Sequence, residues 1–334
     1  MVKPFISIVV IAYNRREFIK DAIKSIINSV AIEDNYELVV VKNFKDEYVD
    51  YLVRKLSGKN ILADIASIGA KVALGIRIAS GDVITFLEDD DMYTSERLRI
   101  IEKTFEVNPS LIYYHNNVLT IDELGKLVCD RLVEESNIFE NVIAGTREDK
   151  LRAFKRYGWG LGLRLSSMAV RKDFAMKWAN IIRAFPDLVD VLIFMLALAE
   201  EGSIIHDPRR LTYYRISGTS ASSVRAVRDP AIRFTKAVKN AARHALARHM
   251  LVTLANRIGL RGYVGYDEAT IIGGIYSGWG KYLAKAMINL MDDVTITHLA
   301  SFIFGLAYLL SPYLAKRLIY LYYTRAFGIW GSGH

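Results

Sequence analysis

The chain has 334 residues, of which 52% are hydrophobic and 24% charged, so it can form one large domain or one domain with a smaller appendage. Its formal net charge of +8 allows a nucleic acid, an anionic lipid or a phosphorylated substrate as a partner. The single cysteine, Cys129, excludes a disulfide framework and a cysteine-based metal cluster within one chain.

The N-terminal part of the chain alternates between strand-like and helix-like patterns. Residues 6–11 form a nearly continuous β-branched run, which is typical of a strand buried on both faces. Strands that alternate with helices at short spacing predict a parallel sheet with helices on both faces. The predicted strands are residues 6–11, 38–41, 61–63 and 83–87, and the predicted helices are residues 18–30, 48–56 and 68–79.

Beyond residue 110 the pattern is less regular. Residues 111–114, 166–170 and 211–216 are predicted to be strands, and residues 189–199 are predicted to be a buried helix. We therefore expect the first domain to cover residues 1–224.

The chain changes character at residue 225. Residues 225–248 follow a helical pattern with seven lysines and arginines and a single acid, Asp229. Residues 294–315 then run for 22 positions without a charge, and a membrane-spanning helix needs about 20. Residues 225–334 are thus predicted to be a basic interfacial helix followed by transmembrane or monotopic helices. A soluble helical subdomain or a dimer interface is the alternative, and we expect no nucleic-acid partner, because an uncharged run has no role in reading DNA.

Four consecutive acids, Glu88 to Asp91, directly follow the strand predicted at residues 83–87. Adjacent carboxylates repel one another, and a divalent cation such as Mg²⁺ or Mn²⁺ offsets that repulsion. Open α/β sheets bind their ligands at the carboxyl ends of the strands. The pattern therefore indicates a metal site at this edge, with a solvated acidic turn as the alternative.

Residues 6–15 (ISIVVIAYNR), 79–82 (ASGD) and 86–91 (FLEDDD) together resemble the inverting glycosyltransferases of family 2, which have the A-type (GT-A) fold. The similarity extends over about residues 4–220. It implies an α/β fold, a Rossmann-like GT-A domain with a mainly parallel sheet, together with a nucleotide-sugar donor and a divalent metal ion.

In this family the last Asp of an Asp-any-Asp (DXD) motif binds the metal on the donor diphosphate, and the first lies near the ribose. The resemblance puts Glu88 at the first position and Asp90 at the last, with Asp91 following; Asp89 to Asp91 is the rival register. It implies that Asp90 and Asp91 bind Mn²⁺ or Mg²⁺ and that Glu88 and Asp89 contact the donor.

Further donor contacts are implied at the ends of other strands. The loop after the first strand is expected to touch the nucleotide. The residues that follow the second strand occupy the position at which the family commonly has an Asp that touches the base. A closing Tyr-Arg segment is expected to supply a guanidinium for the diphosphate. The residues are Ala12, Tyr13, Asn14, Arg15, Lys42, Asn43 and Arg215. An ordinary strand-to-helix turn and an ordinary surface arginine are the alternatives.

Inversion by direct displacement needs a carboxylate that takes the proton of the acceptor hydroxyl. In the family this base is an Asp at the start of a helix, at a set distance before a Gly, and Asp187 and Asp190 are the candidates here. Asp190 fits the distance to Gly202 better, and Asp187 is suited to cap the helix. Trp159 and Ser167 lie where such enzymes line the acceptor site, with core packing as the alternative for Trp159.

These features predict a metal-dependent, non-processive hexosyltransferase, because the Gln-any-any-Arg-Trp motif of processive synthases is absent. The expected donor is GDP-mannose or a UDP-hexose, and the expected acceptor is linked to a polyprenyl phosphate. We expect association with a membrane, with the catalytic domain on its cytoplasmic side. The alternatives are a sugar-nucleotide pyrophosphorylase, which would need a glycine-rich loop after the first strand, and a non-enzymatic membrane scaffold.

Overall fold

The computed structural model describes residues 3–29, 35–216, 230–260, 263–264, 303–304, 306–307 and 310–329. Contacts within the chain divide it into two compact units, Met1–Arg215 and Ile216–His334. The boundary predicted between residues 224 and 225 falls outside the described residues.

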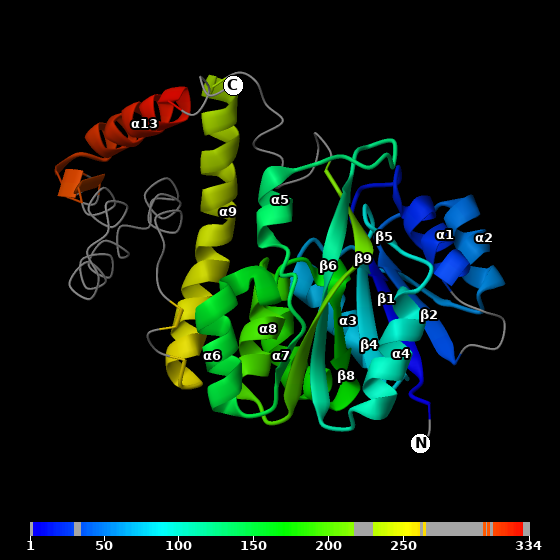
Figure 1. The fold of residues 1–334 in the computed structure, drawn as a ribbon. Helices are drawn as coiled ribbons and strands as arrows, with labels where there is room; N and C mark the ends of the chain where they lie inside the picture. Colours follow the sequence, from blue (N-terminus) through cyan, green and yellow to red (C-terminus); the bar gives the residue numbers. More distant parts are fainter. Residues whose placement is uncertain are drawn as a thin grey trace. The chain divides into compact units, whose positions relative to one another are not determined.

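Nine strands in the described part of the first unit form one mixed sheet (Figure 1). Their order is β3-β2-β1-β4-β8-β6-β9-β5, and β7 pairs with β9. The strands are β1 (Ile6–Ile11), β2 (Tyr36–Lys42), β3 (Lys59–Leu62), β4 (Val83–Glu88), β5 (Met92–Tyr93), β6 (Leu111–Ile121), β7 (Val142–Ala144), β8 (Met168–Arg171) and β9 (Ser203–Arg215). The helices of this unit are α1 (Ile19–Ser29), α2 (Glu47–Lys55), α3 (Ile68–Ile78), α4 (Arg97–Val107), α5 (Arg131–Ser136), α6 (Arg147–Tyr157), α7 (Lys172–Ala184) and α8 (Val189–Ala199).

The parallel half of the sheet consists of β3, β2, β1 and β4, as the sequence predicts. Every residue of β1 is buried, because alternate side chains enter the cores on opposite faces. Ile8 and Val10 pack with α1, α2 and α4, whereas Val9 lies so close to α3 that a Cβ on Gly75 would come within 2.3 Å of it. In register, Ile11 lies beside both Val41 and Glu88, so the ends of these three strands meet at one edge.

The other half of the sheet is mixed rather than parallel. Strand β8 runs antiparallel to β4 and β6, whereas β6 and β9 are parallel, with register shifts around Asn117. Strands β6 and β9 are also longer than the predicted residues 111–114 and 211–216. The reason is that buried polar side chains such as His115 and Asn116 interrupt the apolar pattern from which a strand is predicted.

The described part of the second unit contains α9 (Pro230–Arg257) and α13 (Pro312–Ile329), which pack against each other. The basic stretch is helical from residue 230 onwards, as predicted, and its first residues lie outside the described range. Within the residues that the structure describes, no helix has both the length and the apolar character needed to cross a bilayer. Most of the uncharged run of residues 294–315 lies outside them, so the membrane segment stays a prediction.

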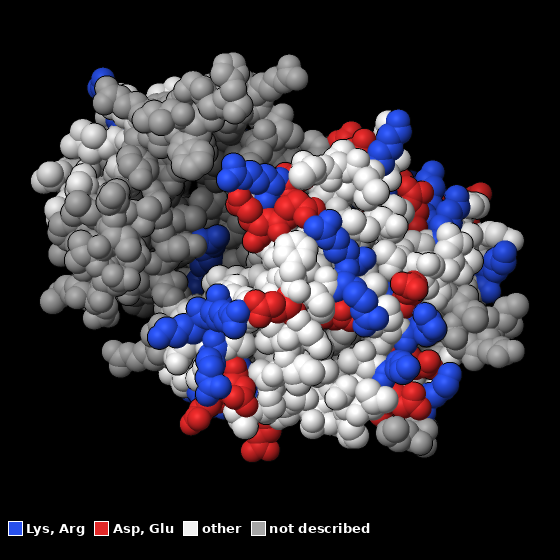
Figure 2. Space-filling model, in the orientation of Figure 1, with Lys and Arg blue, Asp and Glu red and all other residues white. Residues whose placement is uncertain are grey.

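Basic and acidic side chains are interspersed over the face of the first unit shown in Figure 2. The described part of the first unit also contains surface ion pairs such as Arg156–Glu140 and Arg131–Glu135. A mixed surface does not favour a polyanion, so the described residues of this face offer no support for nucleic-acid binding.

Candidate active site

The loops after β1 and β2 are tied together at the carboxyl edge of the sheet. The backbone N–H of Asn14 donates to Asn43 Oδ1 at 2.9 Å, and Asn43 Nδ2 donates to Asn14 Oδ1 at 2.7 Å. Asn14 has φ 58°, in the left-handed region that asparagine tolerates better than most residues. This reciprocal amide pair fixes two of the loops that are expected to contact a nucleotide.

Arg15 compensates the charge of the acidic turn formed by residues 88–91. Its Nη1 donates to Asp90 Oδ2 at 2.5 Å, and its Nη2 donates to Asp89 Oδ1. Asp89 and Asp90 are 2% and 9% exposed, so water contributes little to their solvation. Burial opposes the charge of Arg15, but the two carboxylates outweigh burial and raise the pKa of Arg15.

Arg215, at the end of β9, holds the same turn from its buried side. Its backbone N–H donates to Asp91 Oδ1 at 3.0 Å, and its Nε donates to the carbonyl of Asp90 at 2.8 Å. Its Nη1 donates to the carbonyls of Asp122 and Glu123, and the side chain is 1% exposed. The guanidinium of Arg215, which also lies 3.5 Å from Asp21 Oδ2, positions the acidic turn, and its contact with a diphosphate stays a prediction.

The compensation of the acidic turn is incomplete. Burial raises the pKa of Asp89 to about 7 although Arg15 lowers it, and burial and the charge of Asp90 raise the pKa of Asp91 to about 7. Asp89 Oδ2 and Asp91 Oδ2 are buried and have no hydrogen-bond partner among the described residues. Buried carboxylate oxygens of this kind fit a hard divalent cation.

The described residues contain no group of three or more His, Cys, Asp or Glu side chains arranged to hold a metal ion. Mg²⁺ is usually bound by one or two carboxylates together with substrate phosphates, and Asp90 and Asp91 can supply that number. The metal site therefore stays a prediction that the donor set permits.

Lys71 is a buried cation beside the acidic turn that the sequence analysis missed. It lies on α3 with 4% exposure, and its Nζ is 4.8 Å from the centroid of the Tyr13 ring. Burial lowers the pKa of Lys71, while the charges of Asp89 and Glu88 act to raise it. The one feature of the sequence that could have revealed Lys71 is that it is a single lysine among the small apolar residues of a buried helix.

Asp190 lies in the first turn of α8 and interacts electrostatically with the acidic turn. Its Oδ2 accepts the backbone N–H of Arg164 at 2.8 Å, and burial raises its pKa. Burial raises the pKa of Glu88 well above its usual value, as do the charges of Asp90, Asp91 and Asp190. The candidate base and the acidic turn contact one short segment, because the N–H of Arg164 binds Asp190 and Ser166 Oγ accepts the N–H of Glu88 at 3.0 Å.

Asp187 stands just before the same helix and has a local role. Its Oδ1 accepts the N–H of Leu188, whose φ of 56° begins the turn into α8. Its charge acts to raise the pKa of Asp190.

Lys42 and Ser167 were expected to contact ligands and are instead part of the protein interior. Lys42 is 1% exposed, donates to the carbonyl of Phe44 at 2.6 Å and pairs with Asp50 at 2.7 Å. Ser167 is fully buried. Lys42 is thus paired within the protein and Ser167 has no exposed surface, and their contacts with ligands stay predictions.

Trp159 is half-buried in an aromatic cluster. Its ring meets Phe154 edge-on at 4.8 Å between centroids and Phe194 at 6.3 Å. Packing, the alternative left open by the sequence, accounts for these contacts.

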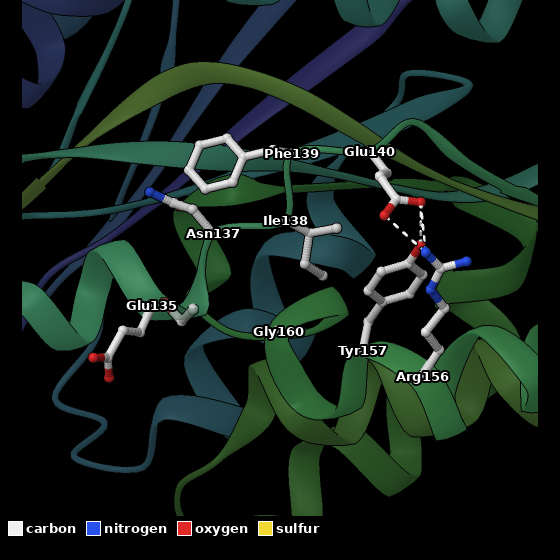
Figure 3. Close-up of a pocket in the computed structure, with 9 residues that line it drawn as sticks. Glu135, Asn137, Ile138, Phe139, Glu140, Arg156, Tyr157 and Gly160 are labelled. Carbon is white, nitrogen blue, oxygen red and sulfur yellow. Dashed lines mark hydrogen bonds and ion pairs between the residues drawn. The ribbon is translucent and has the colours of Figure 1, made fainter.

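A pocket of about 540 Å³ lies next to this region (Figure 3). Phe139, which is 65% exposed, lies on one side, and Glu140 binds Arg156 and the hydroxyl of Tyr157 on the other. The remaining residues of its lining are Glu135, Ser136, Asn137, Ile138 and Gly160. An exposed aromatic ring beside carboxylate and hydroxyl groups suits a polar ligand with an apolar face, such as a sugar.

Residues 7–156 match the model of the family described as glycosyl transferase family 2. An uncharacterized glycosyltransferase of Rickettsia bellii is 29% identical over 134 residues, which are 36% of this chain and 18% of that protein. One of Haemophilus influenzae is 25% identical over 215 residues, which are 62% of this chain and 67% of that protein. The chain spans about a fifth of the length of the Rickettsia relatives that it matches.

Solved structures of S. aureus TarS residues 1–349 share the fold. The complex with UDP-GlcNAc has a TM-score of 0.52 at 16% identity and covers 96% of this chain and 87% of that one. The complex with UDP has a TM-score of 0.53 at 13% identity and covers 91% of this chain and 90% of that one. The first unit thus has the A-type α/β fold that the sequence predicts.

Replacing Arg15 with alanine leaves Asp89 and Asp90 without their cation. We expect the free energy of unfolding at about pH 8 to fall by about 2–3 kcal/mol. This is less than for most broken buried ion pairs, because the side chain of Arg15 is 30% exposed. Because its pKa is raised, Asp89 is largely protonated at about pH 5, so the loss of unfolding free energy should be smaller there. Denaturant unfolding measures both, and Arg16→Ala, whose side chain is exposed, is the matched control. An equal loss in the two variants would contradict this role of Arg15.

Binding of Mn²⁺ should release protons, because Asp89 and Asp91 have pKa values of about 7 and a cation requires the ionised form. We expect Mn²⁺ alone to bind more tightly at about pH 8 than at about pH 6, by up to about tenfold for each proton released per pH unit. Calorimetry in two buffers of different ionisation enthalpy measures the affinity and the proton count. Affinity that does not depend on pH would place the ion elsewhere.

Proposed function

We propose, from the premise that residues 7–156 form a glycosyl transferase family 2 domain, that this chain transfers a hexose from a nucleoside-diphosphate sugar to an acceptor hydroxyl with inversion. The observation that carries this proposal is that residues 164–166 contact both Asp190 and the acidic turn, through the N–H of Arg164 and the hydroxyl of Ser166. Asp190, at the start of α8, acts on the pKa of Glu88, at the end of β4. Inverting transfer needs both a base for the acceptor hydroxyl and charged groups that stabilise the leaving diphosphate.

The chemistry of the proposed site follows from its charges. Burial raises the pKa of Asp190, which makes it a stronger proton acceptor than an exposed carboxylate. Arg15 and Lys71 lie beside the acidic turn, where a departing diphosphate would gain hydrogen bonds and opposite charge. A bound Mn²⁺ or Mg²⁺ would supply further neutralisation of that diphosphate.

A UDP-hexose is the first donor to test, because structures of the same fold hold UDP-GlcNAc and UDP. GDP-mannose is the second. The Asn14–Asn43 amide pair lies at the strand ends where a base would bind, and it offers both donors and acceptors to either nucleobase.

On the acceptor side, we place a glycan in the pocket beside Phe139. Arg164 links this pocket to the proposed base, because its Nη2 donates to Ser136 Oγ at 2.8 Å and its backbone N–H binds Asp190. The basic sequence of α9 and the uncharged run of residues 294–315 support an acceptor carried on a polyprenyl phosphate at the cytoplasmic face of a membrane.

A panel of UDP- and GDP-sugars with Mn²⁺ tests the donor. We expect one donor to raise the Tm of the full chain and to be hydrolysed slowly, since a ligand that binds only the folded state stabilises it. Asp90→Asn should abolish both effects, whereas Asp173→Asn, an exposed acid at the start of α7, should keep them. Release of pyrophosphate from a nucleoside triphosphate would indicate a pyrophosphorylase instead, and binding of neither metal nor nucleotide would indicate a scaffold.

Asp190→Asn should lower kcat for sugar transfer by about 10²- to 10⁴-fold while the Kd of the donor stays within about threefold, because the base acts only on the acceptor hydroxyl. Asp187→Asn should keep kcat within about tenfold, since that carboxylate serves the helix start. Transfer rates at saturating donor and calorimetric Kd values measure the two effects. If Asp187→Asn were the more damaging change, the role of base would pass to Asp187.

A further inference from the structure

Residues 161–164 are clamped between β6 and α8. Tyr113 and His115 lie two residues apart on β6 and therefore on one face, and they bond the carbonyls of Leu161 at 2.9 Å and Leu163 at 2.7 Å. On the opposite side Gly162 lies against Phe194 of α8, so closely that a Cβ would come within 2.4 Å of the ring. This short segment is held by side chains from two elements.

The peptide group between Leu163 and Arg164 connects His115 to Asp190. Its carbonyl accepts from His115 Nε2, and its N–H donates to Asp190 Oδ2 at 2.8 Å. Hydrogen bonds in series polarise one another, so a donor at the carbonyl strengthens the N–H as a donor. Arg164 has φ 70° and ψ 104°, a strained backbone conformation for a residue with a side chain, which persists only where the surroundings impose it.

His206 lies against the ring of His115, with the two rings stacked at 5.2 Å between centroids. The two residues are register partners on β6 and β9, and their Nδ1 atoms are 3.0 Å apart. His206 Nε2 is 3.0 Å from the carbonyl of Ile138. A carbonyl can only accept, so both Nε2 atoms carry hydrogen, and the Nδ1 atoms are bonded to each other when one further proton lies between them.

The buried environment works against that proton. Burial lowers the pKa of His115, and the charges of His206, Arg164 and Arg97 lower it further. Burial also lowers the pKa of His206, which Asp207 acts to raise. The ring of His115 is therefore held by the bond from its Nε2 to Leu163 and by stacking on the His206 ring, with 5.2 Å between the ring centroids.

We propose that His115, with its ring held by His206, is a positioning residue for the base Asp190, acting through the peptide group of Leu163 and Arg164. The proposal rests on the proposed function in so far as Asp190 is the base. Without the bond at the carbonyl, Arg164 relaxes from its strained conformation and its N–H leaves Asp190. A displacement of about 1 Å at a reacting group costs up to about 10²-fold in rate.

Two variants of His115 distinguish the roles of its two ring nitrogens. In His115→Gln the amide nitrogen reaches the position of Nε2 and keeps a donor for Leu163, whereas in His115→Asn the shorter amide occupies the position of Nδ1 and loses it. We expect His115→Asn to lower kcat roughly 10- to 100-fold with the Kd of the donor unchanged, and His115→Gln to keep kcat within about fivefold. Tyr113→Phe, which removes the neighbouring bond to Leu161, should lower the Tm without this loss of kcat. Equal losses of kcat in all three variants would overturn the proposal.

Combining His115→Asn with Asp190→Asn provides a sharper test. If His115 acts through Asp190, adding His115→Asn should not reduce the residual rate further, whereas a merely structural role would multiply the two losses. A crystal structure of His115→Asn should show Arg164 with negative φ and its N–H moved away from residue 190. Retention of that bond would refute positioning even if the chain transferred no sugar, so this outcome is distinct from failure of the proposed function.

Discussion

The first unit depends on the compensation of four consecutive acids by two arginines from distant parts of the chain. Arg15 follows β1 and pairs with the buried carboxylates of Asp89 and Asp90, and Arg215 ends β9 and bonds Asp91 and the backbone of the turn. Because a buried carboxylate without a partner is costly, the turn can form only when both strands are in place. The acidic turn thereby couples the parallel half of the sheet to the mixed half.

The two arginines compensate only part of the negative charge of the acidic turn, and the remaining charge determines what the site can bind. Two carboxylate oxygens that have no hydrogen-bond partner among the residues described, and the raised pKa values of Asp89 and Asp91, indicate a turn that a further positive charge would stabilise. A diphosphate brings negative charge to the same place, so binding of a cation and of a diphosphate should favour each other. Lys71 and Arg15 already provide part of the opposite charge on the protein side.

The sequence predicts the parallel half well because β1, β2 and β4 are apolar runs whose burial is visible in their composition. It also singles out the acidic turn and places Asp190 at a helix start, where the structure has it, because consecutive acids and an acid at a helix start are local signals. It does not show that Arg215 bonds the acidic turn, because Asp90 is brought near Arg215 only by the fold. It misses Lys71 for the same reason, because nothing nearby in the sequence records the charge that a buried side chain faces.

Backbone strain gives an independent indication of where function lies. Four non-glycine residues in the described part of the chain have positive φ: Asn14, Ser57, Arg164 and Leu188. Asn14 orders the loop after β1, and Arg164 and Leu188 stand on either side of the contact to Asp190. Each such residue costs free energy that the surrounding structure must supply, and strained positions of this kind cluster at sites where a group has to be held in place. Three of the four thus lie in the loop after β1 or beside Asp190, so the strained positions coincide with the places where the proposed nucleotide and base would have to be aligned.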